Sequence, residues 1–303
     1  MGVAELLARW PVVRQIRARD LHGRGLTARR DPSPAPSQEP VGFFTDSSIC
    51  IGCKACEVAC REWNGLDPGG GEPVLLASSY DHTGRLGADS WRHVAFVEQE
   101  SGAGLRWLMS SDVCKHCAEA ACLDVCPTGA LFRTEFGSVV LQADVCNGCG
   151  YCVPACPFGV IERREGDGRA FKCTLCYDRL QHDLTPACAK ACPTGSITFG
   201  SRAEMERMAR DRHQRLHSEG VDQARLYGLE DGSGEGVGGA ASIFLLLDRP
   251  EVYGLPTRPE APGRHLQEGW VAAAVGIAAL AAGVLAAALT SSRPPVSPRG
   301  RSS

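Results

Sequence analysis

The sequence has 303 residues, sixteen cysteines, a formal net charge of −3 and a pI near 6.3. The length allows one large or two small domains with a real core, and the charge gives no indication of nucleic-acid binding. The composition argues against a secreted disulfide scaffold, because such scaffolds are short and this chain groups its cysteines in tight C-x2-C sets. The spacing favours metal–sulfur ligation instead.

Residues 1–40 are expected to form a basic arm that contains proline and serine. Arginines separated by apolar residues predict a short amphipathic helix over Val3–Ala18, followed by a solvated linker to Pro40. The arm lacks the continuous apolar stretch of a secretory signal. Prolines rather than a hydrophobic stretch follow the pair Arg29-Arg30, so the likeness to a twin-arginine signal is superficial.

Four cysteine sets lie between residues 41 and 200, and set three has the spacing C-x2-C-x2-C-x3-C-P. This run is typical of the bacterial ferredoxins that bind [4Fe–4S] clusters. A zinc knuckle needs two separated pairs of ligands, so a third cysteine at two-residue spacing is surplus to it. In chain order the sets are Cys50, Cys53, Cys56 and Cys60; Cys114, Cys117, Cys122 and Cys126; Cys146, Cys149, Cys152 and Cys156; and Cys173, Cys176, Cys188 and Cys192.

An internal repeat surrounds the last cysteine of three sets: CPTGAL at 126–131, CPFGVI at 156–161 and CPTGSI at 192–197. In each copy proline ends the helical turn that carries the cysteine, and glycine permits a tight reversal. Set one has Arg61 in place of this proline. The repeated corner predicts an α+β fold of two ferredoxin-like modules, each holding two [4Fe–4S] clusters, with peripheral hairpins and loops.

The segments between the sets carry weaker signals. Two apolar or alternating runs around Ser-Gly-Ala-Gly predict a hairpin inserted at about residues 92–109. A loop is expected over 67–73, a strand over 137–142, and a helical segment over 177–183 in the long gap of set four.

Residues 201–268 are predicted to hold a helix, a glycine-rich break, a strand and an extended linker. Ser201 with Glu204 forms a capping box, and the helix that follows shows one apolar stripe. The flexible break covers 231–240, the strand covers 242–247, and the proline-rich extended segment covers 249–258.

Residues 269–290 are predicted to span a membrane. Trp270 to Thr290 has no charge over 21 residues and would rise about 31 Å as a helix, the thickness of the hydrocarbon layer. A buried core helix is the alternative. The basic tail 291–303 then lies in the cytoplasm and the cluster domain on the outer, periplasmic side. Since the chain has no signal of its own, it is expected to cross folded with a signal-bearing partner.

The cysteine sets predict an electron relay. In two-cluster ferredoxins three cysteines of a run hold one cluster and the fourth ligates the other. Spacing leaves the partner sets open, but closeness in sequence favours pairing sets two and three, and hence one and four. Four basic residues beside ligands either raise cluster potentials or are solvated surface charges: Lys54, Lys115, His116 and Lys172. No metal-binding histidine motif, phosphate loop or nucleophile elbow indicates a substrate site.

Three segments closely resemble the iron–sulfur (beta) subunit of membrane-bound respiratory formate dehydrogenase. They are GFFTDSSICIGCKACEVACREWN, KHCAEAACLDVCPTGALFRTEFGSVVLQADVCNGCGYCVPACPFGVI and KCTLCYDRLQHDLTPACAKACPTGSITFG, within a likeness that covers about residues 41–289. The resemblance implies a non-catalytic electron-transfer subunit of a heterotrimer or a higher assembly of it. The implied partners are a molybdenum or tungsten pterin catalytic (alpha) subunit, which carries the twin-arginine signal, and a cytochrome b (gamma) subunit that reduces quinone.

The resemblance also implies how sixteen cysteines divide among four [4Fe–4S] clusters. Electrons would enter at cluster 1 and leave toward haem from cluster 3. The implied ligands are Cys50, Cys53, Cys56 and Cys192 for cluster 1; Cys114, Cys117, Cys122 and Cys156 for cluster 2; Cys146, Cys149, Cys152 and Cys126 for cluster 3; and Cys173, Cys176, Cys188 and Cys60 for cluster 4.

Two alternatives stay open. One is the beta subunit of another anchored oxidoreductase, such as hydrogenase or a polysulfide or tetrathionate reductase. The other is a membrane adaptor whose cysteines bind structural zinc and have no redox role. Because metal binding couples to folding, the central region is expected to be largely unfolded without iron and sulfide.

Overall fold

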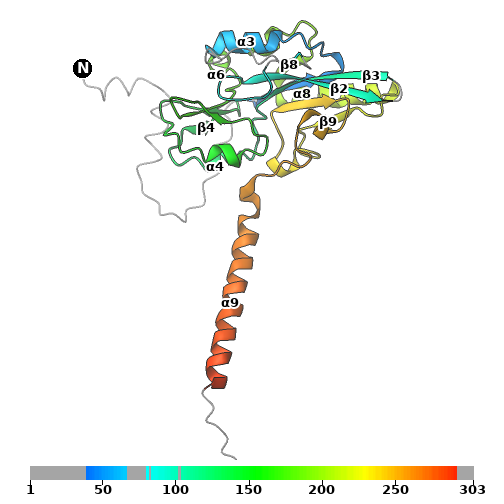
Figure 1. The fold of residues 1–303 in the computed structure, drawn as a ribbon. Helices are drawn as coiled ribbons and strands as arrows, with labels where there is room; N and C mark the ends of the chain where they lie inside the picture. Colours follow the sequence, from blue (N-terminus) through cyan, green and yellow to red (C-terminus); the bar gives the residue numbers. More distant parts are fainter. Residues whose placement is uncertain (1–38, 67–79, 82, 102–103, 292–303) are drawn as a thin grey trace, which may run out of the picture. The chain divides into compact units, whose positions relative to one another are not determined.

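The computed structural model describes residues 39–66, 80–81, 83–101 and 104–291 (Figure 1). The helix predicted over Val3–Ala18, the loop over 67–73 and nearly all of the basic tail lie outside the described residues.

A four-stranded sheet joins the two ends of the cysteine-containing region. Its order is β8-β1-β10-β9, with β1 at Val41–Asp46, β8 at Ile197–Ser201, β9 at Arg225–Tyr227 and β10 at Ser242–Leu246. β1 pairs antiparallel with β8 and parallel with β10. Strand β10 was predicted over 242–247, and its continuous apolar run fits a central strand buried on both faces.

The two faces of this sheet support different parts of the molecule. On one face Phe44, Ile243 and Leu245 pack against α8, Arg202–Ser218. Because side chains alternate along a strand, their neighbours, including Phe43, point to the other face and join the core around the cysteines. Helix α8 begins as predicted, with the Ser201 hydroxyl accepting a hydrogen bond from the Glu204 backbone N–H at 3.3 Å.

The predicted hairpin is present and longer than the sequence indicates. β2, Arg92–Ser101, pairs antiparallel with β3, Gly104–Val113, in continuous register from Arg92 opposite Val113 to Ser101 opposite Gly104. Figure 1 shows the two strands as long cyan arrows. β3 leads directly into set two, so the hairpin fixes where that set begins.

Short elements carry the cysteine sets. Set one follows η1, Ser47–Ile49, and continues on α3, Ala55–Asn64, while set four contains α6, Tyr177–Leu180, and α7, Ala187–Lys190. α6 is shorter than the helical segment predicted over 177–183. Helices α3 and α7 contact each other, which places sets one and four side by side.

Sets two and three form a second group, drawn in green in Figure 1. Helices α4 and α5 contact each other, and two small antiparallel pairs, β4 with β5 and β6 with β7, complete this part. β5 lies within the strand predicted over 137–142. The elements are α4 at Ala121–Asp124, β4 at Leu131–Arg133, β5 at Val139–Leu141, α5 at Cys152–Ala155, β6 at Glu162–Arg163 and β7 at Ala170–Phe171.

Two expectations for the later chain need correction. Residues 231–240 are a packed loop rather than a flexible break: they contain η2, Glu235–Val237, and their carbonyls accept hydrogen bonds from the backbone N–H groups of Ala118 and Glu119. The segment expected to be extended contains η3, Pro250–Tyr253. Proline favours the first position of a helical turn, and Gly254 ends the turn in the left-handed conformation.

The last helix, α9, spans Leu266–Ser291 and follows η4, Pro262–His265. Residues Gly269–Ala288 have a mean hydropathy of 2.3, and none of this window is buried against the rest of the chain. The helix is long and apolar enough to cross a membrane, and the alternative of a buried core helix finds no support in the described residues.

Candidate metal centres

The C-x2-C pairs share one backbone conformation. The residue before the second cysteine has a positive φ in every set: Gly52 at 64°, His116 at 46°, Gly148 at 73° and Leu175 at 59°. A left-handed residue there curls the chain so that both thiols face the same side. In set four the turn also directs the Leu175 N–H to Cys173 Sγ at 3.3 Å. Since the conformation is unfavourable for histidine and leucine, a tight local geometry is being enforced.

The third cysteine of each set lies at the start of a helix, on α3, α4, α5 or α7. In sets two, three and four the fourth cysteine follows the helix and precedes proline, and the repeat glycines Gly129, Gly159 and Gly195 have φ between 61° and 71°. The predicted corner is therefore confirmed. In set one, Arg61 lets α3 continue to Asn64, and Gly65 ends it with a φ of 57°.

We call residues 41–66 with 172–201 module A, and residues 114–171 module B. Module A contains sets one and four, and module B contains sets two and three. One small cavity in module A is lined by Cys50, Cys53, Cys56 and Cys192. Three cysteines of set one and the last of set four thus face a common space.

Electrostatic neighbours show the other cysteines that lie together. Burial raises the pKa of Cys60, and the negative charges of Cys188 and Cys176 raise it further. Burial likewise raises the pKa of Cys173 well above its usual range, with Cys60 the leading charged neighbour. Because Coulomb interactions weaken with distance, the last cysteine of set one lies among the first three of set four.

Module B shows the same exchange. Burial raises the pKa of Cys117, and the charges of Cys114, Cys156 and Cys122 add to the shift. Burial raises the pKa of Cys152 to about 11, with charge contributions from the remaining cysteines of that neighbourhood, Cys146, Cys126 and Cys149. Each set of module B therefore keeps three cysteines together and places its fourth beside the other set.

Three further interactions connect these neighbourhoods. Burial raises the pKa of Cys56, Cys173 and Cys122, and smaller charge contributions add to it: Cys188 at Cys56, Cys114 at Cys173 and Cys152 at Cys122. In each pair the two sulfurs belong to different neighbourhoods.

The donor set fits polynuclear iron–sulfur clusters. All sixteen cysteines are free thiols. Within the described ranges, no three His, Cys, Asp or Glu side chains come close enough together to hold one metal ion. The thiols instead gather in groups drawn from two sets each, and burial raises the pKa of many of them, so metal binding must displace their protons.

Three of the four basic residues expected beside ligands are buried, which corrects the alternative that they are solvated. Lys115, His116 and Lys172 are each at most 2% exposed. The Lys172 ammonium donates to the carbonyls of Cys173, at 3.0 Å, and Val139. Lys54 is only partly exposed and forms an ion pair with Glu57 at 3.5 Å.

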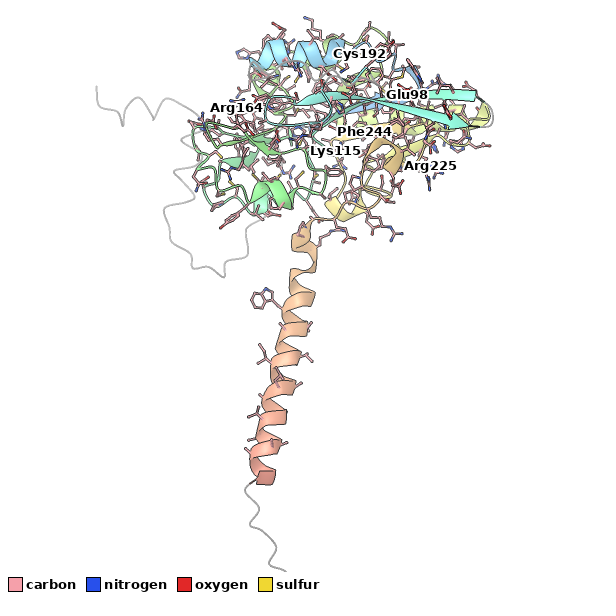
Figure 2. The ribbon with its side chains drawn as sticks, in the orientation of Figure 1. Glu98, Lys115, Arg164, Cys192, Arg225 and Phe244 are labelled. Carbon is pink, nitrogen blue, oxygen red and sulfur yellow. The ribbon has the colours of Figure 1, made fainter. Side chains whose placement is uncertain are left out.

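Lys115 and His116 occupy the first turn of set two. The Lys115 ammonium pairs with Asp112 and lies 4.8 Å from the centre of the Phe244 ring, and Figure 2 labels Lys115 and Phe244. His116 Nδ1 accepts a hydrogen bond from the Val139 N–H at 3.1 Å. Burial, followed by the charge of Lys172, lowers the pKa of His116 well below its usual value, so this imidazole is neutral.

Sequence reasoning missed Arg92 and Ser111, two polar residues that contact the cysteines from the hairpin. Arg92 Nη2 lies 3.3 Å from Cys188 Sγ, and Ser111 Oγ lies 3.2 Å from Cys56 Sγ. The sequence offers no signal for either contact, because Cys188 lies ninety-six positions after Arg92 and Cys56 lies fifty-five positions before Ser111.

Comparison with known families gives two matches, both described as a 4Fe-4S dicluster domain. One model matches residues 49–130 and the other residues 105–202. Together they cover all four cysteine sets.

Three curated relatives show how far the similarity extends. The chain is 40% identical over 249 residues to the formate dehydrogenase-O iron-sulfur subunit of Escherichia coli (strain K12), which covers 80% of each chain. It is 42% identical to the nitrate-inducible formate dehydrogenase iron-sulfur subunit of the same organism over 73% of this chain and 74% of the relative. Identity to the B subunit of the anaerobic dimethyl sulfoxide reductase of E. coli is 37%, over 55% of this chain and 76% of the relative.

Proposed function

The chain belongs to the family of formate dehydrogenase iron-sulfur subunits, and from that premise we propose that it relays electrons through four [4Fe–4S] clusters, from a molybdenum or tungsten pterin catalytic subunit to a cytochrome b that reduces quinone. It is an electron-transfer subunit, and the oxidation of formate is assigned to the partner.

The sixteen cysteines are proposed to bind the clusters in the grouping implied by the resemblance. The shared cavity supports the ligands of cluster 1, and the electrostatic neighbours support the ligands of clusters 2, 3 and 4. Fourth cysteines are exchanged within module A and within module B. We accordingly assign the fold to the α+β class, with two ferredoxin-like modules.

One observation supports the relay: sulfurs of neighbouring cysteine groups lie close enough to influence one another's charge. Cys56 with Cys188 links the proposed clusters 1 and 4, Cys173 with Cys114 links 4 and 2, and Cys122 with Cys152 links 2 and 3. These links support a row of clusters in the order 1–4–2–3. Two cysteines are exposed, Cys53 and Cys149, and they belong to the two terminal clusters of the row.

Electrons are proposed to enter beside Cys53 and to leave beside Cys149. When bound, each cluster accepts and releases one electron at a time. The protein holds the ligands in fixed turns and excludes water from the middle of the row, where Leu175, Lys172 and His116 are buried. The exposed ends are the positions at which a donor and an acceptor subunit can approach.

Helix α9 is proposed to anchor the subunit in the cell membrane by a single pass. An exposed apolar helix of this length supports the anchor. Arg293, Arg299 and Arg301 follow it without an acidic residue between them, so the positive-inside rule supports our proposal of a cytoplasmic C-terminus with the clusters on the periplasmic side.

Formate is favoured as the source of electrons because the formate dehydrogenase relatives match 73–80% of this chain, whereas the dimethyl sulfoxide reductase relative matches 55%. A beta subunit for another anchored oxidoreductase, of the hydrogenase or polysulfide or tetrathionate reductase type, is the second candidate. The dimethyl sulfoxide reductase relative supports that broader class.

The test is to purify the chain from membranes with its associated subunits, measure iron and acid-labile sulfide, and add formate. Formate should reduce the clusters, seen by electron paramagnetic resonance, and then a quinone analogue. Clusters that dithionite reduces but formate does not would refute the substrate and leave the relay. Zinc without sulfide would refute the relay itself.

A further inference from the structure

Arg92 is an arginine buried in the interior without an acidic partner. It opens β2, is 2% exposed, and is among the largest fully buried side chains of the described residues. No carboxylate in the described part of the chain forms an ion pair with it, and its Nε–H has no hydrogen-bond partner there. A buried, unpaired cation is costly, so its surroundings must offset the charge.

The offsetting groups are cysteine sulfurs on both sides of the guanidinium. Burial alone would lower the pKa of Arg92, but the negative charges of Cys188, Cys56, Cys173 and Cys60 outweigh it and raise the pKa. These four cysteines come from set one and set four. Arg92 therefore lies between two cysteine neighbourhoods rather than inside one of them.

Hydrogen bonds connect the two sides through Arg92 and Ser111. Arg92 Nη2 donates to Cys188 Sγ at 3.3 Å, and Nη1 donates to Ser111 Oγ at 3.3 Å. Arginine has no acceptor, so the Ser111 hydroxyl accepts this bond and directs its own hydrogen to Cys56 Sγ, 3.2 Å away. The bridge thus donates a hydrogen bond to a cysteine sulfur at each of its two ends.

The hairpin holds this bridge rigidly. The Ser111 carbonyl accepts a second bond from Arg92 Nη1, at 3.2 Å, and the guanidinium carbon lies 5.0 Å from the centre of the Phe43 ring in β1. Ser111 itself is 1% exposed. Water has little access to screen the charge, so its effect on both sulfurs is strong.

We propose that Arg92 and Ser111 form a positioning bridge that raises the reduction potentials of clusters 1 and 4 together. The inference rests on the proposed grouping of the cysteines and concerns two residues that have no role in ligation. Reduction adds negative charge, which the guanidinium stabilises through Cys188 directly and through Ser111 and Cys56 indirectly.

The bridge makes different predictions for its two members. Arg92→Met removes the charge and all three donated bonds, so two of the four reduction steps should move to lower potential, each one-electron equilibrium constant falling about tenfold or more. Ser111→Ala removes the hydroxyl that donates to Cys56 but leaves the bond from Arg92 to Cys188. A single reduction step, that of cluster 1, should therefore move to lower potential. Arg92→Lys keeps the positive charge but loses the planar guanidinium that bonds Ser111 and Cys188 at the same time. The same two reduction steps should therefore move by less than in Arg92→Met.

The experiment titrates the purified full-length protein, clusters in place, with dithionite and follows each cluster by electron paramagnetic resonance. Ser110→Ala is the matched control, because Ser110 is a buried neighbour on β3 with no sulfur contact among the described interactions, and it should move no step. Iron and sulfide are measured first, so a protein without clusters refutes the proposed function separately.

With all four clusters present, an Arg92→Met protein whose steps are unmoved, or whose four steps move equally, would overturn the bridge. If the Arg92→Met protein does not bind its four clusters, the titration of the Ser111→Ala protein tests the proposal instead. One lowered step supports the bridge, and an unchanged titration refutes it.

Discussion

Modules A and B present their cysteines through the same kind of turn, but they bring their two cysteine sets together in different ways. In module B the two sets are neighbours in the chain, with Cys126 and Cys146 only twenty positions apart, and the strands are two or three residues long. Module A joins sets at opposite ends of the region by pairing β1 with β8 and β10. The same arrangement of cysteines can therefore be supported by turns between neighbouring residues, as in module B, or by a sheet whose strands are far apart in the sequence, as in module A.

Removing the clusters should produce the largest difference between the modules. In protein prepared without iron and sulfide, module B should lose its structure because short strands alone bury too little surface. The sheet with α8 should remain folded on its own apolar core. Hydrogen exchange checks this: amides of β4 and β5 should lose protection while those of β10 keep it. Equal protection in both places would contradict the comparison.

Arg61→Pro should break module A at the one corner that lacks proline. Arg61 lies inside α3, so proline removes a helical hydrogen bond and costs about 3 kcal/mol. The last turn of α3 also carries Trp63, whose Nε1 donates to Asp178 at 2.7 Å across to set four. Urea unfolding should show the loss, and tryptophan fluorescence should change.

Arg61→Ala is the control for this substitution, because within the described residues its side chain makes only the bond to Ser90 Oγ at 3.2 Å, and losing it should cost less than about 1 kcal/mol. If the proline variant were as stable as the alanine variant, the continuous α3 would not be needed for module A.

Gly42→Ala should weaken the long-range closure directly. A Cβ at Gly42 would clash with the backbone carbonyl oxygen of Ala241, so β1 and β10 must separate. The expected loss is about 1–3 kcal/mol in unfolding free energy. Gly232→Ala, where a Cβ meets open space, should leave stability nearly unchanged. Calorimetry on both variants tests whether the sheet supports module A.

Lys172→Met should have the smallest effect on structure. Its main effect should be on the reduction potentials of the clusters where modules A and B meet. Lys172 follows module B's last strand, precedes Cys173, and acts on the buried Cys122 through its charge. Losing the cation should lower the potentials of clusters 2 and 4 by destabilising the reduced state. The exposed Lys190, changed to Met, is the control. Unchanged potentials in a redox titration would remove Lys172 from the tuning residues.

The sequence was most informative where structure is local. The CPTG corners, the hairpin, the capped start of α8 and the apolar α9 all depend on neighbours a few residues away. Arg92 could not be recognised, because its role needs Cys188, ninety-six positions later, to fold against β2. The glycine-rich segment at 231–240 was misjudged for the same reason, since its carbonyls are bound by residues of set two.

The two halves of module A are far apart in the sequence, so the ribosome synthesises them at different times. Cys56 and Cys192 are 136 positions apart, so at about 5–20 residues per second the ribosome delivers the second roughly 7–27 s after the first. During that interval module B can be completed from contiguous chain. In the proposed grouping, Cys50, Cys53 and Cys56 lack their fourth ligand, Cys192, during that interval, which makes the nascent first set the part of the protein most exposed to oxidation or to capture of a wrong metal.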